Sequence, residues 1–159
     1  MLTPLSVPFN VAALHIAGRL WPKGFDVSAD APATFEDMVA NFKATGRHVV
    51  WSGASDRTIF GDPEVNYAFR AWHDWHHISR SLDFSDASEH EVFAGQYRDV
   101  RGIYGNGEAA QDFCDLLYAE IIGQLEFKNR HGNFPADQRG FVRHYLASPT
   151  RAVDNHLYA

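Results

Sequence analysis

Hydrophobic residues recur with helical spacing over most of the chain. Helices are therefore predicted for the segments 10–20, 34–46, 62–81, 85–104, 108–129 and 135–146. Asp62 and Pro63 suit the N-cap and the first position of the first long segment, and Thr34 suits the N-cap of a shorter one. Because three of these segments are long, we expect a mostly α chain, folded as a single-domain helical bundle with three long core helices over residues 1–159.

A β-like pattern occurs at one place in the sequence. The run His48-Val49-Val50-Trp51 and the run Thr58-Ile59-Phe60 flank a small polar turn, so they predict a short β-hairpin before the long helices. The turn, residues 52–56, has the composition of an ordinary loop, although its backbone N–H groups could also bind a phosphate. Residues 1–33 and 149–159 are expected to be less regular, and the tail after Pro149 to be weakly ordered.

Carboxylate and amide side chains interrupt the apolar faces of two long predicted helices. On a helical wheel, Glu120 and Gln124 fall in the middle of the apolar face of segment 108–129. Glu89 lies one turn before Phe93 on the face that we expect segment 85–104 to bury. A buried carboxylate costs several kcal/mol unless it is paired, protonated or bound to a metal. Two inward carboxylates also cannot lie close together and both ionise without a cation.

Three of the nine histidines lie within five residues, on the remaining long helix. His76 falls on its inner face, His73 at the edge of that face and His77 one turn beyond His73. Histidines at positions i and i+4 can bind one metal ion. We therefore predict a site for Zn, Mn, Fe or Co, with His73, His77 (or His76) and Glu120 as ligands. Glu89 is a further ligand or the general base.

Each of these residues also has a plainer interpretation. A buried histidine is usually a hydrogen-bonded core residue, and a carboxylate near a helix start, such as Glu89, can simply stabilise that helix end. In that case the inward polar groups would form a hydrogen-bonded network that specifies the fold without a metal.

Charge and cysteine usage narrow the classes of function. The chain has 159 residues and a formal net charge of −6, which argues against binding to extended nucleic acid or to a membrane surface. The single cysteine, Cys114, fits a cytoplasmic protein best. The apolar first twenty residues lack a basic region before them, so we predict neither a signal peptide nor a membrane span.

One stretch resembles a family of proteins of unknown activity that bacteriophages and prophages encode. The family carries a phrase like F-R-A-x-H-D-x-x-x-H, then a Glu that opens the next helix, then E-x-x-G-Q. The matching residues are Phe69, Arg70, Ala71, His73, Asp74, His77, Glu89, Glu120 and Gln124. The resemblance covers roughly residues 46 to 147, and the second histidine of distant members lies one residue further on. It implies the site and a phage origin, hence a host-cell cytoplasm, but no reaction. The His73-Asp74 pair is also similar to HD-type phosphohydrolases, for whose other residues only His48 with Asp112 or Asp115 could loosely stand in.

Together these observations predict a small helical metal-dependent hydrolase that acts on a small phosphorylated or nucleotide-like substrate. In it Gln124 would position water or substrate, and Arg70 would bind an anionic group of the substrate. Asp74 is counted with Glu89 and Gln124 in the catalytic group, but it lies on the outward side of its helix, where it would either support a ligand or be merely solvated. Two alternatives stay open. One is a metal-free accessory or inhibitor protein that binds a host protein. The other is a di-iron-type oxidase, although the chain lacks the Glu-x-x-His pairs that such centres usually use.

Overall fold

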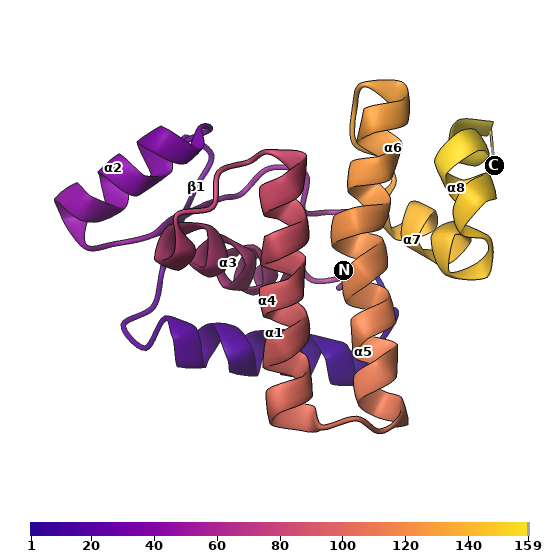
Figure 1. Cartoon of the computed structure of the whole chain (residues 1–159), viewed down its shortest axis with the longest axis horizontal. Helices are drawn as coiled ribbons and strands as arrows, with labels where there is room; N and C mark the ends of the chain where they lie inside the picture. Colours follow the sequence, from indigo (N-terminus) through magenta and orange to yellow (C-terminus); the bar gives the residue numbers. More distant parts are fainter. Residues whose placement is uncertain (159) are drawn as a thin grey trace. The chain divides into compact units, whose positions relative to one another are not determined.

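The computed structural model describes residues 1–158, and helices account for most of them (Figure 1). The prediction of a mostly α chain is confirmed. The chain divides into two compact units, the first covering Met1–Val92 and the second beginning at Phe93. This border falls inside a helix, α4 (Asp86–Tyr104), so a continuous helix rather than a loop joins the units.

The first unit contains five of the described elements in addition to the start of α4. They are α1 (Val7–Leu20), β1 (Asp26–Ser28), α2 (Phe35–Thr45), β2 (Val49–Trp51) and α3 (Pro63–Arg80). α1 begins three residues before the predicted start, because the Ser6 hydroxyl accepts the Phe9 N–H at 3.1 Å. Pro8 lies in the first turn, where a residue without an N–H donor costs nothing.

The predicted caps of the next two helices are confirmed. The Thr34 hydroxyl accepts the Asp37 N–H at 3.1 Å, and Gly46 ends α2 in the left-handed conformation with φ 69°. The Asp62 carboxylate accepts the Glu64 N–H at 3.0 Å and starts α3. Local side-chain chemistry therefore sets where the histidine-bearing helix begins.

The predicted β-hairpin is wrong for the described residues. β2 pairs with β1, and the two strands run in parallel, with α2 as the crossover between them. The run 58–60 is buried, but its backbone bonds to the N-terminal segment, where the Leu5 N–H donates to the Ile59 carbonyl at 2.9 Å. The apolar run correctly marked this segment as buried, but apolar composition does not specify a pairing partner.

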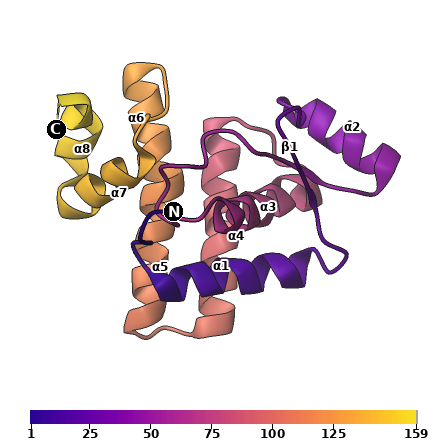
Figure 2. The same ribbon diagram turned by 180° about the vertical axis from the view of Figure 1, so that it is seen from behind.

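α1 packs against α3 (Figures 1 and 2). Aromatic side chains form the core between the two helices. The Phe9 ring stacks on Phe60 with centroids 5.9 Å apart, and Phe69 contacts Phe60 at 5.0 Å and Trp72 at 5.9 Å. The Trp72 and Phe60 side chains are completely buried. Such buried rings fix the rotation of α3 about its own axis, and thus the directions in which its histidines point.

The second unit contains one long helix in three sections, followed by two shorter helices. The sections are α5 (Glu108–Tyr118), the π-helical turn η1 (Ala119–Gly123) and α6 (Gln124–His131). They are followed by α7 (Gln138–Ala147), α8 (Pro149–Asn155) and a short 3₁₀ turn, η2 (His156–Tyr158). The regular helix in α8 contradicts the predicted weakly ordered tail, whose last residue, 159, lies outside the described residues. Pro149 had suggested an end, but it occupies the first turn of α8, where proline favours a helix.

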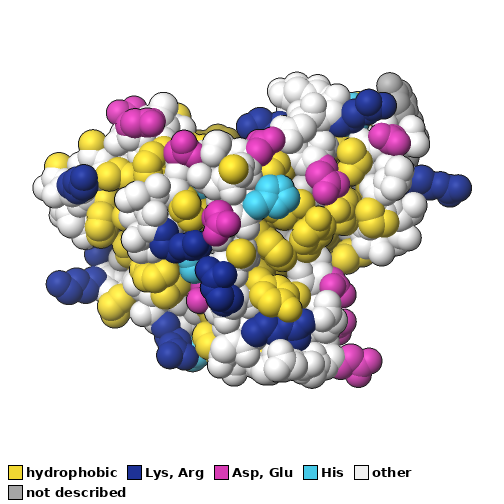
Figure 3. All heavy atoms as spheres, viewed as in Figure 1, with side chains coloured by type: hydrophobic (Ala, Val, Ile, Leu, Met, Phe, Trp, Pro, Cys, Tyr) yellow, Lys and Arg dark blue, Asp and Glu magenta, His cyan; other side chains and the backbone are white. Residues whose placement is uncertain are grey.

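The exterior carries charges of both signs. On the face drawn in Figure 3, basic and acidic side chains lie singly or in small groups among apolar and neutral ones. Within residues 1–158, no helix combines the length and the apolar character that crossing a bilayer requires.

Candidate metal centre

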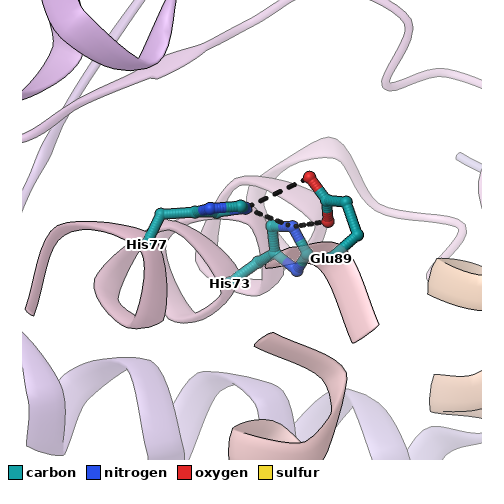
Figure 4. A group of neighbouring side chains, drawn as sticks. All are labelled: His73, His77 and Glu89. Atoms are coloured by element: carbon teal, nitrogen blue, oxygen red, sulfur yellow. Dashed lines mark hydrogen bonds and ion pairs between the residues drawn. The ribbon is translucent and has the colours of Figure 1, made fainter. Parts of the chain in front are cut away.

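Three side chains of the first unit meet where α3 and α4 approach each other (Figure 4). The Nε2 atoms of His73 and His77 lie 3.1 Å apart. The Glu89 carboxylate faces both rings, with Oε2 3.0 Å from His73 Nε2 and Oε1 3.3 Å from His77 Nε2. One potential ligand atom from each residue lies within 4.8 Å of the other two.

The two histidines face the same way because they are four residues apart on α3. This spacing stacks side chains on one side of a helix. The His77 side chain is only 1% exposed, whereas those of His73 and Glu89 are 19% and 17% exposed. The cluster is therefore closed on the His77 side and open to solvent beside the other two residues.

The loop between α3 and α4 fixes the tautomer of His77. Its Nδ1 lies 2.7 Å from the Leu82 carbonyl oxygen, which can only accept a hydrogen bond. Nδ1 therefore carries a proton, and Nε2 is the nitrogen that faces the cluster. The Phe84 ring packs edge-on against His77, with centroids 4.9 Å apart.

The same loop also fixes the start of α4. The Asp83 carboxylate accepts hydrogen bonds from the Ser85 hydroxyl at 2.6 Å and from the Ser88 hydroxyl at 2.8 Å. Ser81 turns the chain out of α3 in the left-handed conformation, with φ 52°. A short, internally bonded connection of this kind holds Glu89, in the first turn of α4, at a defined height beside α3.

The buried face of α4 differs from the predicted one. Val92, Gln96 and Val100 are fully buried, whereas Tyr97 is 39% exposed under the Arg101 guanidinium. The helical wheel predicts an apolar face of Phe93, Tyr97, Val100, Ile103 and Tyr104, of which Val100 is fully buried and the last two are exposed. Glu89 lies one turn before Val92 on the buried face, so the inward direction predicted for Glu89 is correct.

Electrostatics keep Glu89 ionised. Burial alone would raise the pKa of this carboxyl, but hydrogen bonds and charge from His73 and His77 outweigh it and hold the pKa far below its ordinary value. The site therefore holds a fixed negative charge opposite two imidazoles.

This donor set suits a transition-metal ion. Around a tetrahedral Zn²⁺ with bonds of about 2.0–2.1 Å, neighbouring ligand atoms are about 3.3–3.4 Å apart, close to the spacing of the two Nε2 atoms. Two histidines and a carboxylate form catalytic zinc sites, which leave a position for water, and also hold non-haem Fe(II). The observed set excludes sulfur ligands and offers both nitrogen and oxygen.

His77, not His76, is the histidine that the structure brings to His73 and Glu89. The two alternatives differ by one residue, which corresponds to about 100° around the helix. The buried His76 ring instead lies against Trp75, with centroids 5.1 Å apart.

Glu120 and Gln124 belong to the second unit. Both are buried, so the prediction that they face inward is confirmed. Glu120 lies within the π-helical turn and Gln124 directly follows it. Such turns often occur at functional sites. Their roles as a ligand and as a water-positioning group stay predictions.

Asp74 turns to a different partner from its neighbour His73. Its Oδ2 lies 2.9 Å from the Nε2 of the buried His48. The His48 ring stacks on Trp21 at 5.0 Å, and the Trp21 indole N–H donates to the Ala71 carbonyl at 2.8 Å. Asp74 thus ties β2 and α1 to the helix that carries the cluster, so its contact with the site is indirect.

Arg70 is bonded to the turn after β2. Its Nη1 donates to the carbonyls of Trp51 and Gly53, both at 2.6 Å, and its guanidinium lies over the Trp51 ring. These contacts give Arg70 a structural role, because its guanidinium joins α3 to the backbone carbonyls of the turn. Its predicted contact with a substrate stays a prediction.

The sequence did not point to Leu82 or Phe84. A backbone carbonyl leaves no mark on residue type, so Leu82 could not be found from composition. Phe84 had a weak signal, an isolated aromatic residue in a polar loop between two helices.

Comparisons of the chain with protein-family models, with curated protein sequences and with solved structures found no significant match.

Proposed function

We propose that this protein is a divalent-metal-dependent hydrolase whose metal is held by His73, His77 and Glu89. The observation that carries the proposal is the convergence of two imidazole Nε2 atoms and one ionised carboxylate at 3.0–3.3 Å, partly open to solvent. The Leu82 carbonyl supports it further, because its hydrogen bond with Nδ1 leaves Nε2 as the nitrogen of His77 that can bind an ion.

The charge of the site supports a phosphorylated substrate. Two neutral imidazoles and one carboxylate cancel only part of a divalent charge, so the loaded site is a net cation. A bound divalent ion would polarise a phosphoryl oxygen and lower the pKa of a water molecule toward neutrality. Glu89 contacts both rings, which favours its role as a ligand over that of general base. A small phosphorylated or nucleotide-like molecule remains the proposed substrate class.

The sequence predicts further residues of the reaction. Gln124 is expected to position water or substrate and Glu120 to be a further ligand, and for these two residues of the second unit the roles stay predictions. Asp74 acts through His48 and would hold α3 in place. Arg70 would bind an anionic group of the substrate.

A metal-free role has its own supporting observation. The distances from His73 and His77 to Glu89 are also those of ion pairs, so a protonated histidine could satisfy the carboxylate without an ion. The cluster would then be a polar network that joins two helices, as in a protein that binds a host protein.

Metal content distinguishes the two roles. Tag-free protein is purified without chelator and analysed by ICP-MS beside a His73→Ala/His77→Ala variant. A His15→Ala/His90→Ala variant is the control, because both of these histidines are exposed. The proposal predicts that the parent and the control carry more metal than the folded His73/His77 variant does. Equal metal in all three, or none after reconstitution with Zn(II), Mn(II) and Fe(II), would exclude the site.

Activity is the second measurement. Metal-loaded protein is screened against phosphoesters and nucleotides, with Glu120→Ala and Glu89→Gln variants beside it. Hydrolysis that requires metal and disappears in Glu89→Gln supports the hydrolase. A loaded protein without activity on any of these substrates would leave a metal-binding protein and remove the hydrolase from the proposal.

A further inference from the structure

A second pair of histidines lies in the second unit, far along the chain from the first. His144 is in the last turns of α7, and His156 begins the 3₁₀ turn after α8. Their Nδ1 atoms face each other at 3.4 Å, and their ring centroids are 5.6 Å apart. Both residues are partly buried, so the pair lies at the edge of the core within reach of solvent.

The distance between the two nitrogens is long for a hydrogen bond. N–H donors usually approach their acceptors to about 2.9–3.0 Å. By contrast, two nitrogens bound to one tetrahedral ion at about 2.0–2.1 Å lie about 3.3–3.4 Å apart. The spacing of His144 and His156 therefore matches two ligands of one ion better than a direct contact.

Aromatic packing holds the His156 ring in this position. It lies edge-on to Phe141 at 5.6 Å and to Phe127 at 6.5 Å, and it bonds to the backbone of Asp137. The segment before it is anchored as well, because His131 Nε2 donates to the Val153 carbonyl at 2.6 Å. A ring held by such contacts loses little further freedom when it binds an ion.

The Asp137 carboxylate lies near the pair and favours a positive charge at this place.

We propose that His144 and His156 form a second site for a transition-metal ion, independent of the one at His73 and His77. The ion would be of the class that imidazole prefers, Zn(II), Ni(II) or Cu(II), with water completing its coordination. It would join the end of α7 to the turn after α8, and so hold the C-terminal segment on the second unit.

Four proteins test this assignment. They are the parent, His73→Ala/His77→Ala, His144→Ala/His156→Phe and the variant with all four changes. Phenylalanine at 156 keeps the aromatic contacts with Phe127 and Phe141 while it removes the nitrogen. Each protein is dialysed against Zn(II) at equilibrium, and bound metal is counted.

The two proposals make separate predictions in this experiment. If both sites exist, the four proteins bind about two, one, one and zero equivalents of Zn(II). If only the second pair binds, the parent and the His73/His77 variant each bind about one equivalent, and the His144/His156 variant binds none. The second site is overturned if the His144/His156 changes leave the count of bound metal unchanged while circular dichroism reports a folded protein.

Hydrogen exchange provides a second test. If His144 and His156 only pack against each other and bind no metal, Zn(II) will not change amide exchange around them. In the His73→Ala/His77→Ala background, Zn(II) should slow amide exchange in residues 149–158, because the ion ties this segment to α7. The exchange of α3 is the internal control and should stay the same. No change in 149–158 would contradict the proposed link, even if some metal is bound.

Discussion

The two histidine pairs reach similar spacings by different routes. His73 and His77 are four residues apart on one helix, so the helix itself sets the distance of 3.1 Å between their Nε2 atoms. His144 and His156 are twelve residues apart in different elements, and their 3.4 Å spacing requires α8 and the following turn to dock on α7. The first pair is thus locally determined and the second is a product of tertiary packing.

The pairs also differ in the groups around them. The first has the Glu89 carboxylate against both nitrogens and the Leu82 carbonyl behind one ring. At the second pair the two nitrogens face each other, and the nearby Asp137 carboxylate caps α7 by accepting the Gly140 N–H at 3.0 Å. An additional charged ligand and a fixed tautomer both raise metal affinity, so we expect tight binding at the first pair and weaker binding at the second.

The largest expected effect is the loss of a first-pair ligand. His77→Ala should lower the Zn(II) affinity of that site by more than about 100-fold, beyond the effect of changing a group that only supports a ligand. A competition titration with a zinc indicator measures it. His76→Gln is the matched control, since this buried neighbour on α3 lies outside the cluster. Equal losses in both variants would mean that folding of α3, not ligation, is what changed.

Glu89→Gln tests whether the carboxylate makes the difference between the pairs. The amide keeps the size and one oxygen but removes the charge, so Zn(II) affinity at the first pair should fall about 10–100-fold, toward that of the second pair. The measurement is the same titration, in the His144→Ala/His156→Phe background so that one site is observed. An unchanged affinity would show that the carboxylate is not a ligand.

Phe84→Ala tests the support behind His77. The ring packs against His77 and also contacts Phe35 at 6.0 Å, so its loss frees the imidazole to turn. Zn(II) affinity at the first pair should fall about tenfold. The control is Phe134→Ala, which removes an exposed ring from the second unit. If Phe134→Ala lowers the Zn(II) affinity of the first pair as much as Phe84→Ala does, the support assigned to Phe84 is wrong.

The smallest expected effect concerns the anchor of the second pair. His131→Phe keeps an aromatic ring beside Phe127 but removes the hydrogen bond to Val153. A net loss of about 1 kcal/mol in docking would weaken Zn(II) binding at the second pair by about fivefold. The first pair should be unaffected in calorimetric titration. Weakening at both pairs would argue against a locally anchored second site.

Much of the helical framework follows from short-range signals. The caps at Thr34 and Asp62 and the stop at Gly46 are side-chain and backbone effects within one turn, so the sequence predicts them well. The strand pairing could not be predicted in the same way. A β-like run such as 49–51 can pair with any strand edge that lies beside it. Here α2 returns the chain so that 49–51 pairs with 26–28.

The candidate site divides along the same line. The pairing of His73 with a histidine one turn later, and the inward direction of Glu89, Glu120 and Gln124, follow from helical periodicity. The selection of His77 over His76 depends on the rotation of α3, which the buried rings of Phe69 and Trp72 fix. Helical periodicity alone does not distinguish His76 from His77, whereas a metal site requires one particular histidine.

Most of the helices, the caps at Thr34 and Asp62 and the i, i+4 histidine pair can be predicted from the amino-acid sequence, because they depend on interactions within a few residues. The contact of Glu89 with this pair, of Asp74 with His48 and of His144 with His156 results from tertiary packing. Those contacts join distant segments, and their geometry depends on how whole helices pack. No local spacing in the chain records that packing.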